Sequence, residues 1–158
     1  MFVRDEVLLE VGFAAARAGL AGLGREGLLV SASAAAYGEG MASLDQAGPP
    51  GTARILPVLA EVRFRDLAGR EGRAGLALRW EAAAADGGLF PVLDADITLA
   101  PAGTRAALLV LAGTYRPQPG PPGTAPDRAS ARRLADVTAG SLLRRLAEVL
   151  THPPASAA

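Results

Sequence analysis

The chain has 158 residues, no cysteine and a formal net charge of zero, and only 4% of its residues are aromatic. A chain of this length can bury a substantial core as one domain, and this core must be built from Ala, Leu and Val. A balanced charge argues against a nucleic-acid partner, which requires a basic surface. Without cysteine, disulfides, a thiol nucleophile and thiolate-bound metals are excluded.

Composition also bears on source and location. The 16 basic residues are all Arg, and Ala, Gly and Pro are abundant. We interpret this bias as the imprint of a GC-rich genome, such as that of an actinobacterium. No segment has the pattern of a signal peptide, and no apolar run approaches the ~20 residues that span a bilayer. We therefore expect a cytoplasmic protein without a membrane span.

The first two elements are a strand and a helix. Residues 2–11 alternate between apolar and polar side chains, which predicts a strand. Asp5 alone falls on the apolar side of that strand. The Ala-rich stretch 12–24 predicts a helix that is weakened by two internal glycines.

A second, shorter helix follows. Ser31 or Ser33 could cap it, and the pattern predicts that it runs to Tyr37 and ends at Gly38. Residues 39–46 then predict a short strand, which a Gly-Pro loop follows.

Four further strands form the middle of the chain. Residues 55–66, 74–82 and 89–99 alternate, and glycine-containing turns separate them. Residues 106–115 are apolar on both faces, as expected of a strand covered on both sides. This spacing predicts an antiparallel meander.

The last element is one long helix. Residues 127–150 carry small or apolar side chains at helical spacing, and Asp127 is a candidate N-cap. The simplest way to bury such a stripe is to lay the helix across the strands that precede it. We therefore predict an α+β fold, with a single domain over residues 1–151 and a flexible tail over residues 152–158.

The turns also predict the strand registers. The first places Glu61 opposite Arg79, and the next places Arg79 opposite Asp94 and Trp80 opposite Leu93. Both registers agree on which face of the sheet is apolar. They align Glu61, Arg79 and Asp94 as an acid–base–acid row on the other face.

Asp94 and Asp96 allow two interpretations. Two carboxylates on one face could perform acid–base chemistry if one of them had a raised pKa. Alternatively, they form ordinary cross-strand charge pairs on a solvated face. The registers favour the second interpretation, because they place both residues beside Arg79 and away from the apolar face.

The apolar face is the candidate ligand site. If the last helix closes tightly on this face, the result is a core; if the helix stands off, the result is an apolar pocket with few polar groups. We identify no catalytic residue and expect no metal and no cofactor, because the chain lacks nucleotide-binding and nucleophile motifs and its one histidine, His152, lies in the tail. The candidate ligand-binding residues are Tyr37, Phe64, Leu78, Trp80, Leu93, Thr114, Tyr115, Thr138, Ser141 and Leu142.

Several candidates have a second interpretation. Trp80 could be a core anchor, and Thr138 and Ser141 could bond back to their own helix. Of Thr114 and Tyr115, the register of the strand decides which one faces the helix.

Four segments carry a resemblance to a known family. They are RWEA at 79–82, GGLFPVLDADITLAPAG at 87–103, the GTYRP stretch that leads from Gly113 to Arg128, and the T…SLLRRLA pattern at 138–147. Together with the order of elements, they resemble the helix-grip fold of the START-like (SRPBCC) superfamily. That superfamily includes the Bet v 1-like proteins and the polyketide cyclase/dehydrase group.

The resemblance implies a curved antiparallel sheet with two short helices, wrapped around the long C-terminal helix and leaving a cavity. Members bind lipids or polyketides, and some cyclise or dehydrate the bound molecule. Three hypotheses follow: a binding protein for an apolar small molecule, a polyketide cyclase-like enzyme, and a structural or interaction module such as a homodimer. The chain departs from the cyclising members in one respect, since the registers place no Arg or carboxylate inside.

Overall fold

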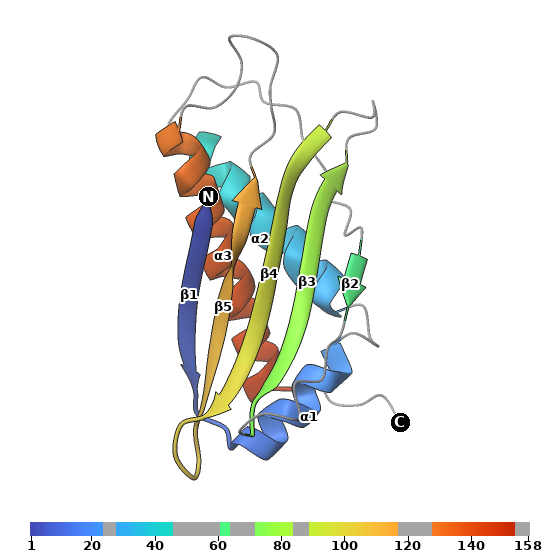
Figure 1. Cartoon of the computed structure of the whole chain (residues 1–158), viewed down its shortest axis with the longest axis vertical. Helices are drawn as coiled ribbons and strands as arrows, with labels where there is room; N and C mark the ends of the chain where they lie inside the picture. Colours follow the sequence, from blue (N-terminus) through green and yellow to red (C-terminus); the bar gives the residue numbers. More distant parts are fainter. Residues whose placement is uncertain (24–27, 46–60, 64–71, 84–88, 117–127, 154–158) are drawn as a thin grey trace.

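The order of elements agrees with the α+β prediction. The computed structural model describes residues 1–23, 28–45, 61–63, 72–83, 89–116 and 128–153. A strand is followed by two helices, four strands and a last long helix (Figure 1). The elements are β1 (Phe2–Leu9), α1 (Phe13–Leu23), α2 (Leu28–Asp45), β2 (Glu61–Arg63), β3 (Ala74–Ala83), β4 (Leu89–Pro101), β5 (Ala107–Arg116) and α3 (Arg128–Thr151).

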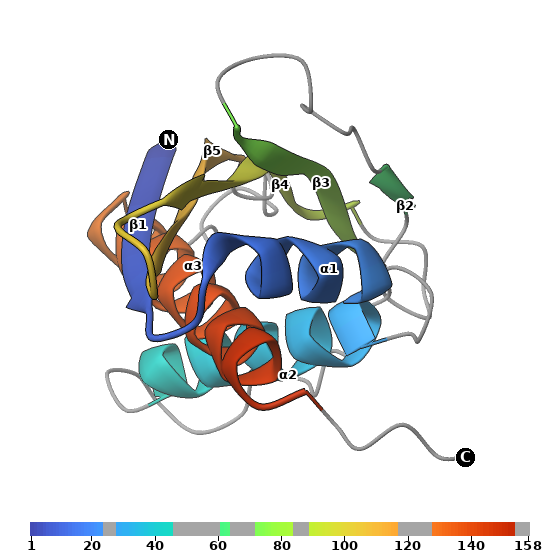
Figure 2. The ribbon, with the colours of Figure 1, turned by 90° about the horizontal axis from the view of Figure 1, so that it is seen from below.

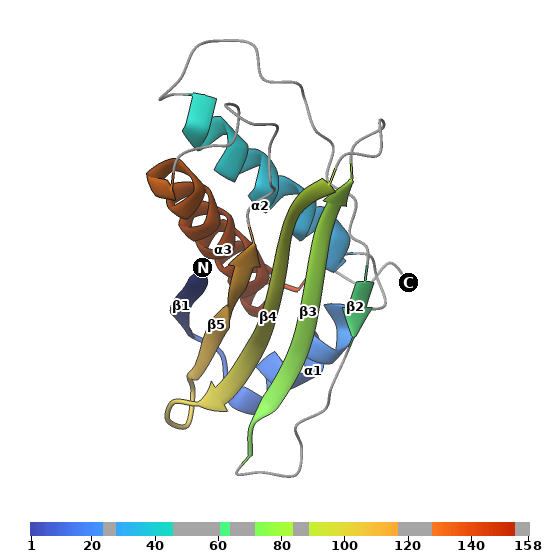
Figure 3. The ribbon, with the colours of Figure 1, turned by 45° about the horizontal axis from the view of Figure 1, so that its top comes forward.

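The five strands form one antiparallel sheet in the order β1-β5-β4-β3-β2. The first strand of the chain therefore lies at an edge, beside the last strand. The three helices lie on one face of this sheet, and α2 is the farthest from it (Figure 2). The tilted view in Figure 3 shows the other face, which none of the three described helices covers. We call the two sides the inner and the outer face.

The predicted registers are confirmed. Glu61 lies opposite Arg79, Arg79 opposite Asp94, and Trp80 opposite Leu93. Turn position and apolar alternation were sufficient to fix them, because a slip by one residue would turn every apolar side chain to solvent. Of the predicted strand 55–66, only residues 61–63 are within the described part of the chain.

The last strand differs from its prediction. Leu109 and Leu111 are buried on the inner face, but Leu108 and Val110 are only half-buried on the outer face. None of the three helices lies on that side. The apolar character of both faces therefore does not mean that helices cover both. On the outer face, partial shielding comes from the neighbouring strands β1 and β4.

The prediction for residues 38–46 is wrong, because α2 continues through Gly38 to Asp45 without a strand. The packing at Gly40 explains why the helix does not end at Gly38. A Cβ atom at Gly40 would overlap the Oγ1 atom of Thr138 and would lie 2.9 Å from a methyl carbon of Leu134, both on α3. The glycine allows two helices to approach each other, and this tertiary contact outweighs the low helix propensity of glycine.

The edge strand β1 is partly capped by its own chain. Met1 and Tyr115 bond each other through both backbone groups, so the backbone groups of Phe2, Arg4 and Glu6 point away from β5. The carbonyl of Phe2 accepts a hydrogen bond from Nη1 of Arg132 at 3.0 Å, and Oδ1 of Asp5 accepts one from the N–H of Glu6 at 2.8 Å. Asp5, which interrupts the apolar alternation, thus protects a free edge from pairing with another strand.

Candidate functional site

The interior of the molecule lies between the inner face of the sheet and helices α2 and α3. Leu78 and Leu93 line it from the sheet, and Leu142 lines it from α3; all three are buried. Among the described residues no charged side chain is buried, and the buried polar side chains other than tyrosine are Ser33, Thr138 and Ser141. The interior is therefore apolar and contains hydroxyl groups as its polar atoms.

One face of α2 contributes two of these hydroxyl groups. Ser33, Tyr37 and Gly40 are four and three residues apart, which places them on one face of the helix. Ser33 and Tyr37 are each only 2% exposed. Burial raises the pKa of the Tyr37 phenol, so this group is a neutral hydrogen-bond donor at physiological pH.

Strand β5 contributes Tyr115. In the observed register Tyr115 points to the helices and is 1% exposed, whereas Thr114 lies exposed on the outer face. The pKa of Tyr115 is raised above its usual value, first by burial and then by electrostatic interaction with Tyr37. The two phenols therefore lie close enough to influence each other.

Helix α3 contributes Thr138, whose Oγ1 atom contacts Gly40 of α2. Gly40 follows Tyr37 by three residues on the same face of α2, so Thr138 meets α2 within one helical turn of Tyr37. We call Ser33, Tyr37, Tyr115 and Thr138 the hydroxyl cluster.

Three members of the hydroxyl cluster lack a hydrogen-bond partner in the part of the chain that the structure describes. They are Ser33, Tyr115 and Thr138. A buried hydroxyl without a partner costs about 1–3 kcal/mol, and native structures contain few such groups. The three hydroxyls come from three different elements, α2, β5 and α3, and all three side chains are buried.

Ser141 has a different role. Its hydroxyl donates to Oε2 of Glu39 at 2.5 Å, and Arg145 also donates to this carboxylate. Arg144 lies 3.8 Å from the same group. These contacts lower the pKa of Glu39, with the Ser141 hydrogen bond as the largest cause. Ser141 and Glu39 thus fasten α3 to α2 at the border of the interior.

The structure therefore separates the candidate residues into groups. Six of them line the interior: Tyr37, Leu78, Leu93, Tyr115, Thr138 and Leu142. Thr114 faces outward, and the hydroxyl of Ser141, one turn after Thr138 on α3, is used by Glu39. Phe64 and the side chain of Trp80 lie outside the described part of the chain.

Sequence reasoning missed Ser33 as a member of the site. A serine near the predicted start of a helix was interpreted as an N-cap. The signal that could have found it is its spacing of four residues from Tyr37, which places both on one helical face.

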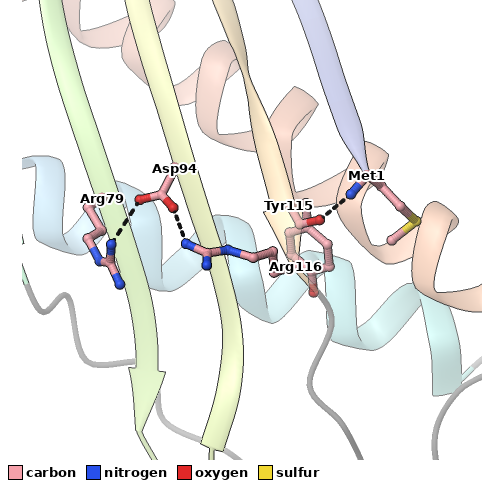
Figure 4. Close-up of polar contacts among 5 residues, drawn as sticks. All are labelled: Met1, Arg79, Asp94, Tyr115 and Arg116. Carbon is pink, nitrogen blue, oxygen red and sulfur yellow. Dashed lines mark hydrogen bonds and ion pairs between the residues drawn. The ribbon is translucent and has the colours of Figure 1, made fainter.

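The outer face holds the two aspartates. Asp94 lies between Arg79 on β3, at 3.5 Å, and Arg116 on β5, at 2.5 Å (Figure 4). The side chains of both arginines are about half exposed, and Asp96 is exposed on the same face. This arrangement is an exposed charge network and is separate from the hydroxyl cluster.

The described residues include no group of three His, Asp or Glu side chains arranged to hold a metal ion. No helix in the same ranges is long and apolar enough to cross a membrane. The polar chemistry of the interior is therefore that of neutral hydroxyl groups, which donate and accept hydrogen bonds.

Comparison with solved structures identifies the fold. The Zhui aromatase/cyclase from Streptomyces sp. R1128 superposes with a TM-score of 0.51 and 12% identity, over 99% of this chain and 97% of that chain. TTHA0849 from Thermus thermophilus gives 0.45 and 19%, over 98% and 100%. No family model and no curated protein matches the sequence. The likeness to the aromatase/cyclase confirms the predicted helix-grip fold.

Proposed function

We propose that the protein binds an uncharged, mostly apolar small molecule between the sheet and helices α2 and α3. The observation that carries this proposal is the set of buried hydroxyls on Ser33, Tyr115 and Thr138 that lack a partner in the described chain. An alcohol, phenol or ketone oxygen of the ligand would supply the missing partner. The leucines around the hydroxyl cluster would bind the apolar remainder of the molecule.

The same site disfavours a charged ligand. No buried Arg, Asp or Glu in the described part of the chain could pair with an ion. An ion buried without a partner is costly, and it would be rejected or neutralised. Because burial raises the pKa of Tyr115 and keeps its phenol protonated, the preferred ligand group is a neutral acceptor of hydrogen bonds.

Displacement of Nile red, an uncharged fluorescent dye, tests the proposal. A long-chain alcohol or ketone should displace the dye at a concentration at least about tenfold lower than the carboxylate of equal length, a difference of about 1.4 kcal/mol. Native mass spectrometry of the purified protein would detect a ligand acquired in the cell. A protein that binds neither the dye nor any of these compounds would contradict the proposal.

A matched pair of variants locates the site. Thr138→Val removes a hydroxyl of the cluster, and Thr151→Val makes the same change on the same helix, where the hydroxyl donates to the Ala147 carbonyl at 2.8 Å. We expect Thr138→Val to weaken binding of the alcohol about tenfold and Thr151→Val to leave it within about twofold, since a net hydrogen bond contributes about 1 kcal/mol. Equal effects would place the ligand elsewhere.

A second candidate function is cyclisation of a bound polyketide-like intermediate, and the buried hydroxyls of Tyr115 and Thr138 favour it. Two neutral donors could hold two carbonyl oxygens of one folded chain, and correct orientation alone can supply a large rate gain. A poly-β-ketone analogue incubated with the protein and with a Tyr115→Phe, Thr138→Val double variant provides the test. A product profile identical to the spontaneous one would exclude this activity.

A further inference from the structure

The outer face of the sheet contains a hollow of about 720 Å³. Its lining includes small residues, Ala77 on β3 and Ala112 and Gly113 on β5. In the strand registers Asp96 of β4 lies between Ala77 and Ala112, so its side chain rises from the hollow with an alanine on either side. Phe2 on β1 and the ion-paired Arg79 and Asp94 also line the hollow.

Phe2 projects beside this hollow and is 61% exposed, more than the other exposed large hydrophobic side chains of the described residues. Burying a Phe side chain completely contributes about 1.5–3 kcal/mol. A projecting ring and a hollow in one patch form a self-complementary surface. In a two-fold pair, each copy supplies both parts.

The charges of the outer face are also complementary between two copies of the chain. Arg4 follows Phe2 by two residues and therefore lies on the same face of β1, where its guanidinium is 3.2 Å from the carboxylate of Glu6 on the same strand. Asp96 in the hollow has no ion-pair partner among the described residues. If Phe2 of one copy enters the hollow of another, Arg4 is carried toward Asp96 of that second copy. Opposite charges at such a contact would fix its orientation.

The alternative of pairing through the free edge of β1 is obstructed. Arg132 occupies the outward carbonyl of Phe2, and Asp5 occupies the outward N–H of Glu6. A strand of another molecule would have to displace both bonds. We therefore infer that a second copy of this chain binds the outer face, sheet to sheet, with Phe2 of each copy in the hollow of the other.

Sedimentation equilibrium of the full chain from about 1 µM to 1 mM tests this inference, and we expect a concentration-dependent dimer. Phe2→Asp should raise the dissociation constant at least about tenfold, as the loss of a central aromatic anchor does. Leu8→Asp is the matched control, because Leu8 is 59% exposed on the same face of β1 but lies outside the hollow. It should change the constant by less than about twofold.

A charge reversal provides a second measurement that does not depend on Phe2. Arg4→Asp and Asp96→Arg should each weaken the dimer, and the double variant should restore it, because the two groups meet across the interface. A monomer at every concentration would overturn the inference. So would a Leu8→Asp effect as large as that of Phe2→Asp, or a double variant that is weaker than both single variants.

Discussion

Polar side chains on the inner side and on the outer face of the sheet differ in whether they have hydrogen-bond or ion-pair partners. On the outer face Asp94 pairs with Arg79 and Arg116, although water could solvate all three and such pairs contribute only about 0–1 kcal/mol. On the inner side, the hydroxyls of Tyr115 on the sheet and Thr138 on α3 have no partner in the described chain, although the two side chains are 1% and 3% exposed. Pairing is thus present where it matters little and absent where its lack is most costly.

This difference indicates what the inner face is adapted for. A core that served stability alone would carry Phe and Val at the positions of Tyr115 and Thr138, because apolar groups of the same shape remove the cost of an unpaired hydroxyl. Under the proposed function, a ligand supplies the partners of these hydroxyls. The following predictions separate an interior that is merely packed from one that is prepared for a ligand.

The largest change in the free energy of unfolding is expected where helices α2 and α3 are in closest contact. Gly40→Ala places a methyl group against Thr138 and Leu134 and should lower the free energy of unfolding by about 1–3 kcal/mol. Gly38→Ala, on the exposed side of the same helix with nothing within 4 Å, should raise it by about 0.5–1 kcal/mol. Urea denaturation measures both. Changes of equal sign would show that α2 and α3 are not in close contact at Gly40.

The second effect concerns the unpaired hydroxyls. Tyr115→Phe and Thr138→Val should each raise the free energy of unfolding of the ligand-free protein by about 1 kcal/mol, because each removes a buried group without a partner in the described chain. In a chain of this size the melting temperature should rise by about 2–4 °C. The same variants should bind the ligand less tightly, so stability and affinity change in opposite directions.

A loss of stability in both variants would contradict this prediction. It would show that the hydroxyls are already satisfied in the ligand-free protein, and the contrast between the two faces would disappear. Thr151→Val is the control, since its hydroxyl donates to the Ala147 carbonyl and its removal should not stabilise the protein.

Much of the sheet could be predicted because its information is local. The alternation on β3 and β4 predicts the registers of Arg79 and Leu93, and these registers alone place Asp94 on the outer face. The choice between Thr114 and Tyr115 needed the third register, which pairs β4 with β5. That strand is apolar on both faces, so alternation could not decide it.

The helices and the site depended on contacts that are distant in sequence. Gly38 ends a helix by local rules, yet α2 continues because α3 packs against Gly40. Ser33 has the features of a cap until its helix is known to begin at Leu28. The proximity of Tyr37 and Tyr115, which lie 78 residues apart in sequence, could not be predicted without the way α2 lies relative to β5.

Glu39 lies at the border between the buried interior and the solvent-exposed surface. The smallest change in the free energy of unfolding is expected from a substitution there. Its side chain is 43% exposed, but it accepts a hydrogen bond from the buried Ser141. Because the pKa of Glu39 is lower in the folded protein, its contribution is complete above the pKa of the unfolded chain and is lost as the pH falls through the folded value. Glu39→Gln should therefore destabilise the protein at pH 7 by less than about 1 kcal/mol, given solvent screening, and should have no effect near pH 2.

Unfolding of the unchanged protein and of the Glu39→Gln variant in urea, at pH 7 and near pH 2, measures this difference. The values near pH 2 serve as the control. A Gln side chain still accepts a hydrogen bond from Ser141, so the change isolates the charge of Glu39 and its pairs with Arg144 and Arg145. An equal loss at both pH values would mean that packing between α2 and α3, not charge, is disturbed. The ion pairs would then resemble those of the outer face, and α2 would be held over the hydroxyl cluster by its apolar contacts alone.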